Sequence, residues 1–212
     1  MFQFSTSYFL APENIDLAAL LGSFGKNADQ RFSDQVRFLK GLLKTYTIDP
    51  KKAQLGIVTF GKSQDVALKF NVAKDRDSAY SLIDKVKNPN DGDDIVGALR
   101  FIRQSLFVAA NGVRPGANKV LFVFLDRKLG DLKAAVNEEI RLIKERGVTV
   151  LQFVLGKDVP KDEIDDIIDV WFFPDPLAEI DPDVIVAVRD KSRPSKYILI
   201  LKIDRFGDNI IF

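Results

Sequence analysis

Short runs of apolar residues alternate along the chain with segments whose apolar residues recur every three or four positions. The most apolar run is Lys119–Leu125 (KVLFVFL), and comparable runs occupy Asp16–Leu21, Gln54–Phe60 and Val148–Leu155. Runs that are apolar at nearly every position predict strands buried on both faces, which is typical of parallel sheets. The segment Phe32–Lys44 instead places its apolar residues on one helical face. This alternation predicts a doubly wound, Rossmann-like α/β fold with helices on both faces of a mostly parallel sheet.

Weaker patterns complete a predicted six-stranded sheet. Val66–Val72 alternates in polarity and predicts an antiparallel strand at one edge, and Asp169–Phe173 predicts a short last strand. In such a sheet, ligands bind where the carboxyl ends of the strands meet the loops. The remaining helices are predicted at Arg76–Val86, from Asp94 to about Phe107, after Asp131, at Pro160–Ile168 and at Asp181–Lys191.

Composition excludes several classes of function. The chain has 31 basic and 30 acidic residues, so its charge gives no reason to expect a nucleic-acid partner. It has neither histidine nor cysteine, which removes the commonest general base, disulfides and thiolate chemistry. A bound metal would therefore need oxygen ligands. No apolar run reaches the roughly 20 residues of a membrane span, so membrane insertion is not expected.

Three stretches together resemble the von Willebrand factor A family. Gln54–Gly61 (QLGIVTFG) is similar to the family's second strand, and Gly92–Leu99 (GDDIVGAL) to its Gly-Thr-x-Thr-x-x-Ala-Leu turn. Gly112–Asp126 (GVRPGANKVLFVFLD) resembles the strand entry of extracellular-matrix members such as matrilins and collagen VI. The resemblance covers residues 14–192 and implies the doubly wound fold expected from the pattern.

The resemblance also implies a metal-ion-dependent adhesion site, whose first loop reads Asp-x-Ser-x-Ser. Counting back from Phe32, at the start of the first predicted helix, aligns the Asp with Gly22 and the two serines with Phe24 and Lys26. None of these side chains is a suitable oxygen ligand. A one-residue shift offers Leu21, Ser23 and Gly25 instead. The first loop therefore resembles a degenerate metal site in either register.

Two carboxylates remain at the other positions of the implied site. Asp93 stands where the family has a Thr, and Asp126 is its third-loop Asp. Two adjacent carboxylates need positive charge nearby, and we expect Lys26 to supply it in place of a metal. No cofactor is expected; if Mg²⁺ or Ca²⁺ binds at all, its ligands would be Asp93, Asp94 and Asp126. Phe24 and Arg127 are candidate contacts for a partner.

The resemblance implies a non-enzymatic module that binds proteins. No phosphate-binding loop, nucleophile elbow or metalloprotease motif is found. We expect a secreted matrix or cell-surface protein whose partner is a collagen, another matrix component or a neighbouring A-type domain. The alternative is an intracellular scaffold subunit, because the absence of cysteine suits a reducing compartment. The sequence Arg114-Pro115-Gly116 favours the matrix group.

The predicted A-type domain spans residues 14–195, with an extension of residues 1–13 before it and a β-forming extension of residues 196–212 after it. Tyr197–Ile203 (YILILKI) strongly favours a strand, and such a strand requires a pairing partner. Two alternatives remain for it. It pairs with the N-terminal segment as an accessory sheet, or it is the first strand of a following A-type domain.

Overall fold

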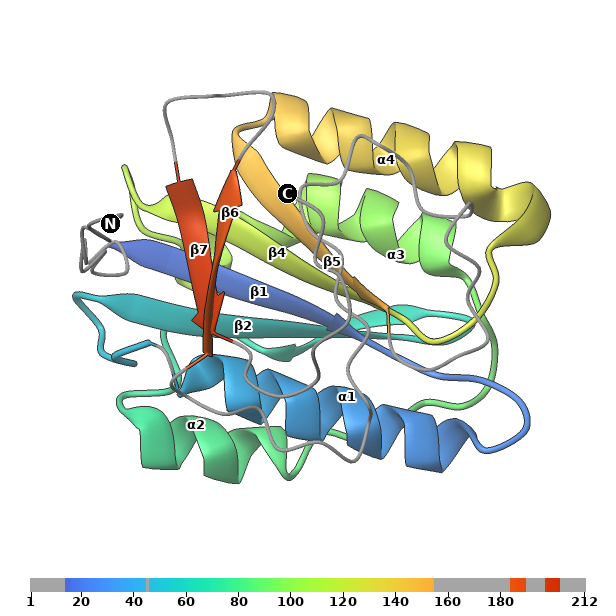
Figure 1. Ribbon diagram of the computed structural model, residues 1–212, viewed down its shortest axis with the longest axis horizontal. Helices are drawn as coiled ribbons and strands as arrows, with labels where there is room; N and C mark the ends of the chain where they lie inside the picture. Colours follow the sequence, from blue (N-terminus) through green and yellow to red (C-terminus); the bar gives the residue numbers. More distant parts are fainter. Residues whose placement is uncertain (1–13, 45, 155–183, 190–196, 203–212) are drawn as a thin grey trace, which may run out of the picture.

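The computed structural model describes residues 14–44, 46–154, 184–189 and 197–202. A five-stranded sheet with the order β3-β2-β1-β4-β5 forms its centre (Figure 1). The central strand β1 pairs in parallel with β2 and β4, β4 pairs in parallel with β5, and β3 runs antiparallel to β2. The strands are β1 (Ile15–Leu21), β2 (Ala53–Phe60), β3 (Gln64–Leu68), β4 (Asn118–Leu125) and β5 (Val148–Val154).

Burial on both faces explains why these strands are apolar throughout. Every residue of β1 and β2 is buried. Alternate residues of β1 contribute to different cores, because Leu17 and Ala19 belong to one buried cluster while Ala18 and Leu20 belong to the other. Successive side chains of a strand point to opposite faces, so a central strand needs apolar residues at odd and even positions alike.

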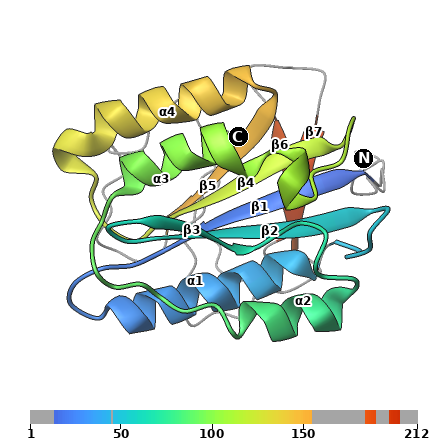
Figure 2. The same cartoon turned by 180° about the vertical axis from the view of Figure 1, so that it is seen from behind.

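Helices cover both faces of the sheet. On one side lie α1 (Ala28–Leu43) and α2 (Arg76–Ile83), and on the other α3 (Ile95–Phe101) and α4 (Lys133–Glu145) (Figures 1 and 2). The predicted fold class is confirmed, including the antiparallel edge strand. The predicted sixth strand (169–173) and the predicted helix at 160–168 lie outside the described residues. No helix in the described ranges is long and apolar enough to cross a membrane.

The ends of several helices differ from the predicted ones. Helix α1 begins four residues before Phe32, directly after Asn27, which adopts a left-handed conformation with φ of 58°. The helix predicted from Asp94 to about Phe107 is divided into α3 and a π-helical turn, η1 (Ile102–Leu106). Asp94 caps α3 by accepting a hydrogen bond from the Gly97 amide at 2.9 Å. Short 3₁₀ turns, η2 (Ala109–Asn111) and η3 (Gly130–Leu132), precede β4 and α4.

The helix predicted at Asp181–Lys191 is wrong. The structure has a strand there, β6 (Val184–Arg189), which pairs antiparallel with β7 (Tyr197–Lys202). The sequence VIVAVR is rich in β-branched residues, which favour strands over helices. The strand predicted at Tyr197–Ile203 is confirmed, and its partner is β6. The predicted domain boundary at residue 195 lies outside the described residues.

Candidate functional site

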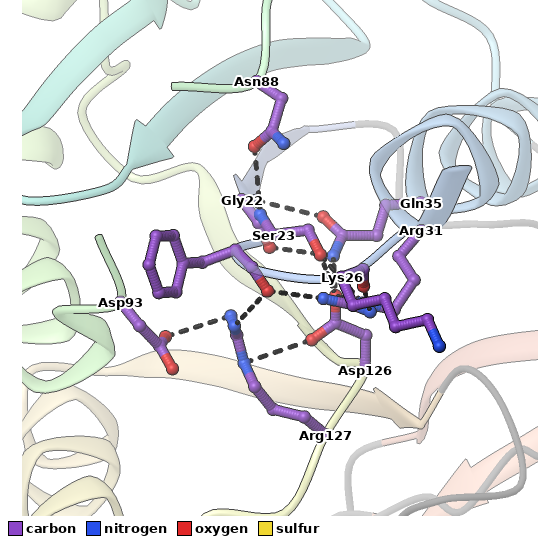
Figure 3. A network of polar contacts seen from close by, with 10 residues as sticks. Gly22, Ser23, Lys26, Arg31, Gln35, Asn88, Asp93, Asp126 and Arg127 are labelled. Atoms are coloured by element: carbon purple, nitrogen blue, oxygen red, sulfur yellow. Dashed lines mark hydrogen bonds and ion pairs between the residues drawn. The ribbon is translucent and has the colours of Figure 1, made fainter. Parts of the chain in front are cut away.

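Three loops meet at the carboxyl end of the central strands. The loop between β1 and α1, residues 22–27, lies beside Asp126 and Arg127, which follow β4 (Figure 3). Asp93 joins them from the loop that precedes α3. Because β1 and β4 are parallel neighbours, their carboxyl ends deliver these loops to one edge of the sheet. This is the position at which the sequence predicted the site.

Asp126 is the centre of the polar network, and its side chain is only 2% exposed. Its Oδ2 accepts hydrogen bonds from Ser23 Oγ at 2.5 Å, Arg31 Nε at 3.0 Å and Gln35 Nε2 at 3.4 Å. Its Oδ1 lies 3.3 Å from Arg127 Nε. Both oxygens of this buried carboxylate are therefore occupied by side chains of the protein, as a buried charge requires.

Arg31 fastens the first loop to the network. From the first turns of α1, its guanidinium donates to Ser23 Oγ at 3.0 Å, to the Phe24 carbonyl at 2.6 Å and to the Lys26 carbonyl. With the ion pair to Asp126 this makes four acceptors, and the planar fork of an arginine suits several acceptors at once. Arg31 thus fixes the course of the loop and compensates the buried charge.

The start of the same loop is held from its other side. Gln35 accepts a hydrogen bond from the Gly22 amide at 3.0 Å and donates one to the Gly22 carbonyl at 2.9 Å. Asn88 Oδ1 accepts from the Ser23 amide at 3.1 Å. A β-carbon on Gly22 would lie 2.6 Å from the Phe60 ring, so a larger residue does not fit there without movement. Gly22 therefore serves the packing of the loop.

Arg127 links the two carboxylates. Its Nη2 lies 3.0 Å from Asp93 Oδ1 as an ion-pair contact, and its Nε lies beside Asp126. Burial raises the pKa of Asp93 above its ordinary value, the Arg127 guanidinium opposes this rise, and the charge of Asp126 adds to it. Asp94 points elsewhere, because it is exposed, caps α3 and accepts a hydrogen bond from Gln64 Nε2 at 3.2 Å.

The expected role of Lys26 requires a correction. Lys26 is exposed, its ammonium points away from both carboxylates, and it forms no ion pair with the described residues (Figure 3). Gly25 and Asn27 both have positive φ, and they turn the loop outward between them. Arg31 and Arg127 supply the positive charge instead.

Sequence reasoning missed Ser23 and Arg31. Ser23 was present in the shifted register, in which a hydroxyl follows Gly22 directly. The available signal for Arg31 was its position, because a cation near the amino end of a helix is disfavoured by the helix dipole unless another interaction compensates. Here that interaction is the ion pair with Asp126.

The residues at this site do not fit a divalent cation. The oxygens of Ser23, Asp93 and Asp126 are of the chemical type that Mg²⁺ or Ca²⁺ binds. However, the guanidinium groups of Arg31 and Arg127 already contact both oxygens of Asp126, and Arg127 also contacts Asp93. In the described ranges, no three acidic side chains gather in a group that could hold a metal.

Known proteins are similar to this chain in sequence. The chain is 24% identical over 193 residues to the human collagen alpha-6(VI) chain, covering 89% of this chain and 8% of that protein. It is 24% identical over 153 residues to chicken matrilin-1, covering 72% of this chain and 30% of that protein. Mouse vitrin is 24% identical over 158 residues, or 74% of this chain and 24% of that protein. The chain therefore spans less than a third of the length of these relatives.

Solved structures share the fold at low sequence identity. Proximal thread matrix protein 1 from the mussel byssus, solved with a zinc-occupied MIDAS motif, has 22% identity and a TM-score of 0.67 over 77% of this chain and 44% of that chain. Manganese-loaded TRAP protein from Plasmodium vivax has 15% identity and a TM-score of 0.62 over 77% of this chain and 69% of that chain. The sequence profile of the von Willebrand factor type A domain matches residues 16–170. The chain belongs to the von Willebrand factor type A domain family.

Proposed function

We propose that this chain carries a non-enzymatic protein-binding module of an extracellular matrix protein, which engages its partner without a divalent cation. The observation that carries the proposal is the saturation of Asp126 by Arg31, Arg127 and Ser23. The cations at the site are thus part of the polypeptide.

The relatives support the matrix setting. Collagen VI, matrilin and vitrin chains all match most of this chain, and the segment around Arg114 resembles the same group. The partner class we propose is a collagen or another matrix component, or a neighbouring A-type domain, and the site of action is extracellular. The described residues around Asp126 provide ion pairs and hydrogen bonds within the loop network, with no exposed nucleophile activated by a base.

Electrostatics support independence from metal. A unit charge about 4 Å from a like charge near a protein surface meets a repulsion of about 4 kcal/mol, and a divalent ion meets more. Arg31 and Arg127 are each only about a quarter exposed, so water screens them incompletely. A cation could reach Asp126 only by displacing both guanidinium groups.

Surface plasmon resonance tests the proposal. The purified chain is passed over immobilised collagen VI, fibrillar collagen and serum albumin, first with millimolar Mg²⁺ and then with excess EDTA. We expect saturable binding to at least one of the collagens, no binding to albumin, and the same response in EDTA. Binding that EDTA abolishes would refute metal independence, and a response no greater than that to albumin would refute a collagen as the partner.

A further inference from the structure

We infer that Arg127 and the residues around it form a recognition surface for an acidic segment of a partner protein, with the guanidinium contacting the partner's carboxylate directly. This inference rests on the proposed function and assigns the chemistry of the partner. We define the Arg127 surface as Phe24, Arg127, Lys128 and Leu132. A carboxylate with an apolar side chain beside it is the occupant that this combination fits.

Arg127 retains donors for such a partner. A guanidinium carries five N–H groups, two on each Nη and one on Nε. Nε faces Asp126, one acceptor, Asp93, contacts Nη2, and one weak acceptor, the Phe24 carbonyl at 3.4 Å, contacts Nη1. One N–H of each Nη group therefore lacks an acceptor among the described residues. Two such donors on one planar group match the two oxygens of a carboxylate.

Exposed apolar side chains lie on the two loops beside Arg127. Phe24 is 43% exposed and Leu132 is 42% exposed, and they are two of the four exposed large apolar residues in the described ranges. Leu132 lines a shallow pocket together with Asp93, Arg127 and Lys128. Phe24 is tied to the same place because its carbonyl contacts both Arg31 and Arg127. Arginine is among the residues that contribute most to binding energy at protein interfaces.

Charge complementarity selects an acidic partner. The two carboxylates of the cluster, Asp93 and Asp126, are already paired with arginine. Lys128 is exposed and forms no ion pair with the described residues, and Asp131, beside Leu132, is an exposed carboxylate, so the donors of Arg127 carry the preference for a carboxylate. The Arg127 surface consequently offers the Lys128 ammonium and the remaining Arg127 donors beside exposed apolar area. An acidic, partly apolar segment gains from both, whereas a basic segment would meet like charges.

Nuclear magnetic resonance on the full chain tests this inference. The probe is the peptide acetyl-Phe-Asp-Leu-amide, with acetyl-Phe-Asn-Leu-amide as the uncharged control, both titrated into ¹⁵N-labelled protein in EDTA. We expect chemical-shift changes at Phe24, Arg127 and Leu132 with the Asp peptide only. Absence of shifts at tens of millimolar peptide, equal shifts with the Asn peptide, or shifts centred elsewhere would each overturn the inference.

Variants separate recognition from folding. Arg127→Gln should weaken the Asp peptide about tenfold, which corresponds to about 1.4 kcal/mol. Because Arg127 also holds Asp93 and Asp126, Phe24→Ser and Lys128→Gln provide variants outside those ion pairs, and each should weaken binding severalfold. Val72→Ser is the matched control, because Val72 is 44% exposed on the loop after β3. This variant should bind the Asp peptide as tightly as the unmodified chain does.

The same variants distinguish this inference from the proposed function. If Phe24→Ser and Arg127→Gln bind immobilised collagen in EDTA as well as the unmodified chain does, the Arg127 surface is refuted and the adhesive role stands. If the unmodified chain fails to bind collagen, collagen as the partner is refuted whatever the peptide titration shows.

Discussion

Replacing Arg31 by methionine should loosen the first loop and destabilise the domain. Arg31 serves four acceptors, which are the Ser23 hydroxyl, the Phe24 and Lys26 carbonyls and the buried carboxylate of Asp126. Methionine matches the apolar stem of arginine as far as about Nε, so the change removes the guanidinium with little loss of packing. The loop would then keep the contacts of Gly22 with Gln35, of Ser23 with Asn88 and Asp126, and the weak contact of the Phe24 carbonyl with Arg127.

The magnitude follows from these contacts. A hydrogen bond to a charged group contributes about 1.5–3 kcal/mol and one to a neutral carbonyl about 0.5–1.5 kcal/mol. Water recovers part of this because the Arg31 side chain is 27% exposed, and Asp126 keeps Arg127 and Ser23. We therefore expect Arg31→Met to lower the free energy of unfolding by about 2–3 kcal/mol. Arg31→Lys should lose about half as much, since one ammonium cannot span the same acceptors.

Urea unfolding followed by circular dichroism measures these differences, and hydrogen exchange of the loop amides locates them. Arg37→Met on the same helix is the matched control, because Arg37 is 51% exposed and, among the described residues, its ion pair is with Asp34 one turn away. It should cost less than about 0.5 kcal/mol, as should Lys26→Met. The conclusion that Arg31 holds the loop would be refuted if Arg31→Met lowered the free energy of unfolding by less than about 0.5 kcal/mol. It would also be refuted if Lys26→Met lowered that free energy as much as Arg31→Met does.

Three further changes test other parts of the structure. Arg114→Met should cost about 3–5 kcal/mol in urea unfolding, because it leaves the fully buried Asp16 carboxylate without its ion-pair partner; a loss below about 1 kcal/mol would contradict this. Burial raises the pKa of Glu139, but hydrogen bonds and charge from two arginines outweigh burial and hold the pKa below its ordinary value of 4.5. The stability advantage over Glu139→Gln should thus be full above pH 4.5 and disappear as the pH falls through the lowered pKa of the folded state; an advantage unchanged in acid would contradict it. The double variant Arg31→Ser, Arg127→Gly should acquire a calorimetric Mn²⁺ affinity of about 1 mM, and no heat of binding would show that the arginines are not what excludes the ion.

Sequence patterns predict the sheet because burial constrains every residue of its central strands. The runs at β1, β2 and β4 are apolar at odd and even positions alike, and few other structures accommodate that pattern. A short apolar run without helical periodicity is harder to assign, since a buried helix segment and a strand look alike. The run at β6 has this character, and the helix predicted there was wrong for that reason.

The candidate site was predictable in place but only partly in composition. Asp93 and Asp126 were identified because they follow or precede well-defined elements. The first loop has no periodicity, so its alignment could slip by one residue, and that slip exchanges Ser23 for Phe24. The counter-charge comes from Arg31 in α1 and from Arg127 after β4, and only the folded chain brings these two residues to the same carboxylate.

One end of the sheet resembles the family in sequence, and the other end departs from the family's metal-binding pattern. Arg114, within the segment that most resembles matrix A-type domains, clamps Asp16 and donates to the carbonyls of Ile15 and Lys52. These contacts lie where β1 and β2 begin, whereas Asp126 lies beyond the end of β4. That similarity therefore reflects a device that stabilises the fold, and the departure from the metal-binding pattern is confined to the opposite end. On the proposal that the partner binds at that opposite end, the metal-loaded structures are a guide to the scaffold of this domain, and Arg31 and Arg127 are what distinguish its site from theirs.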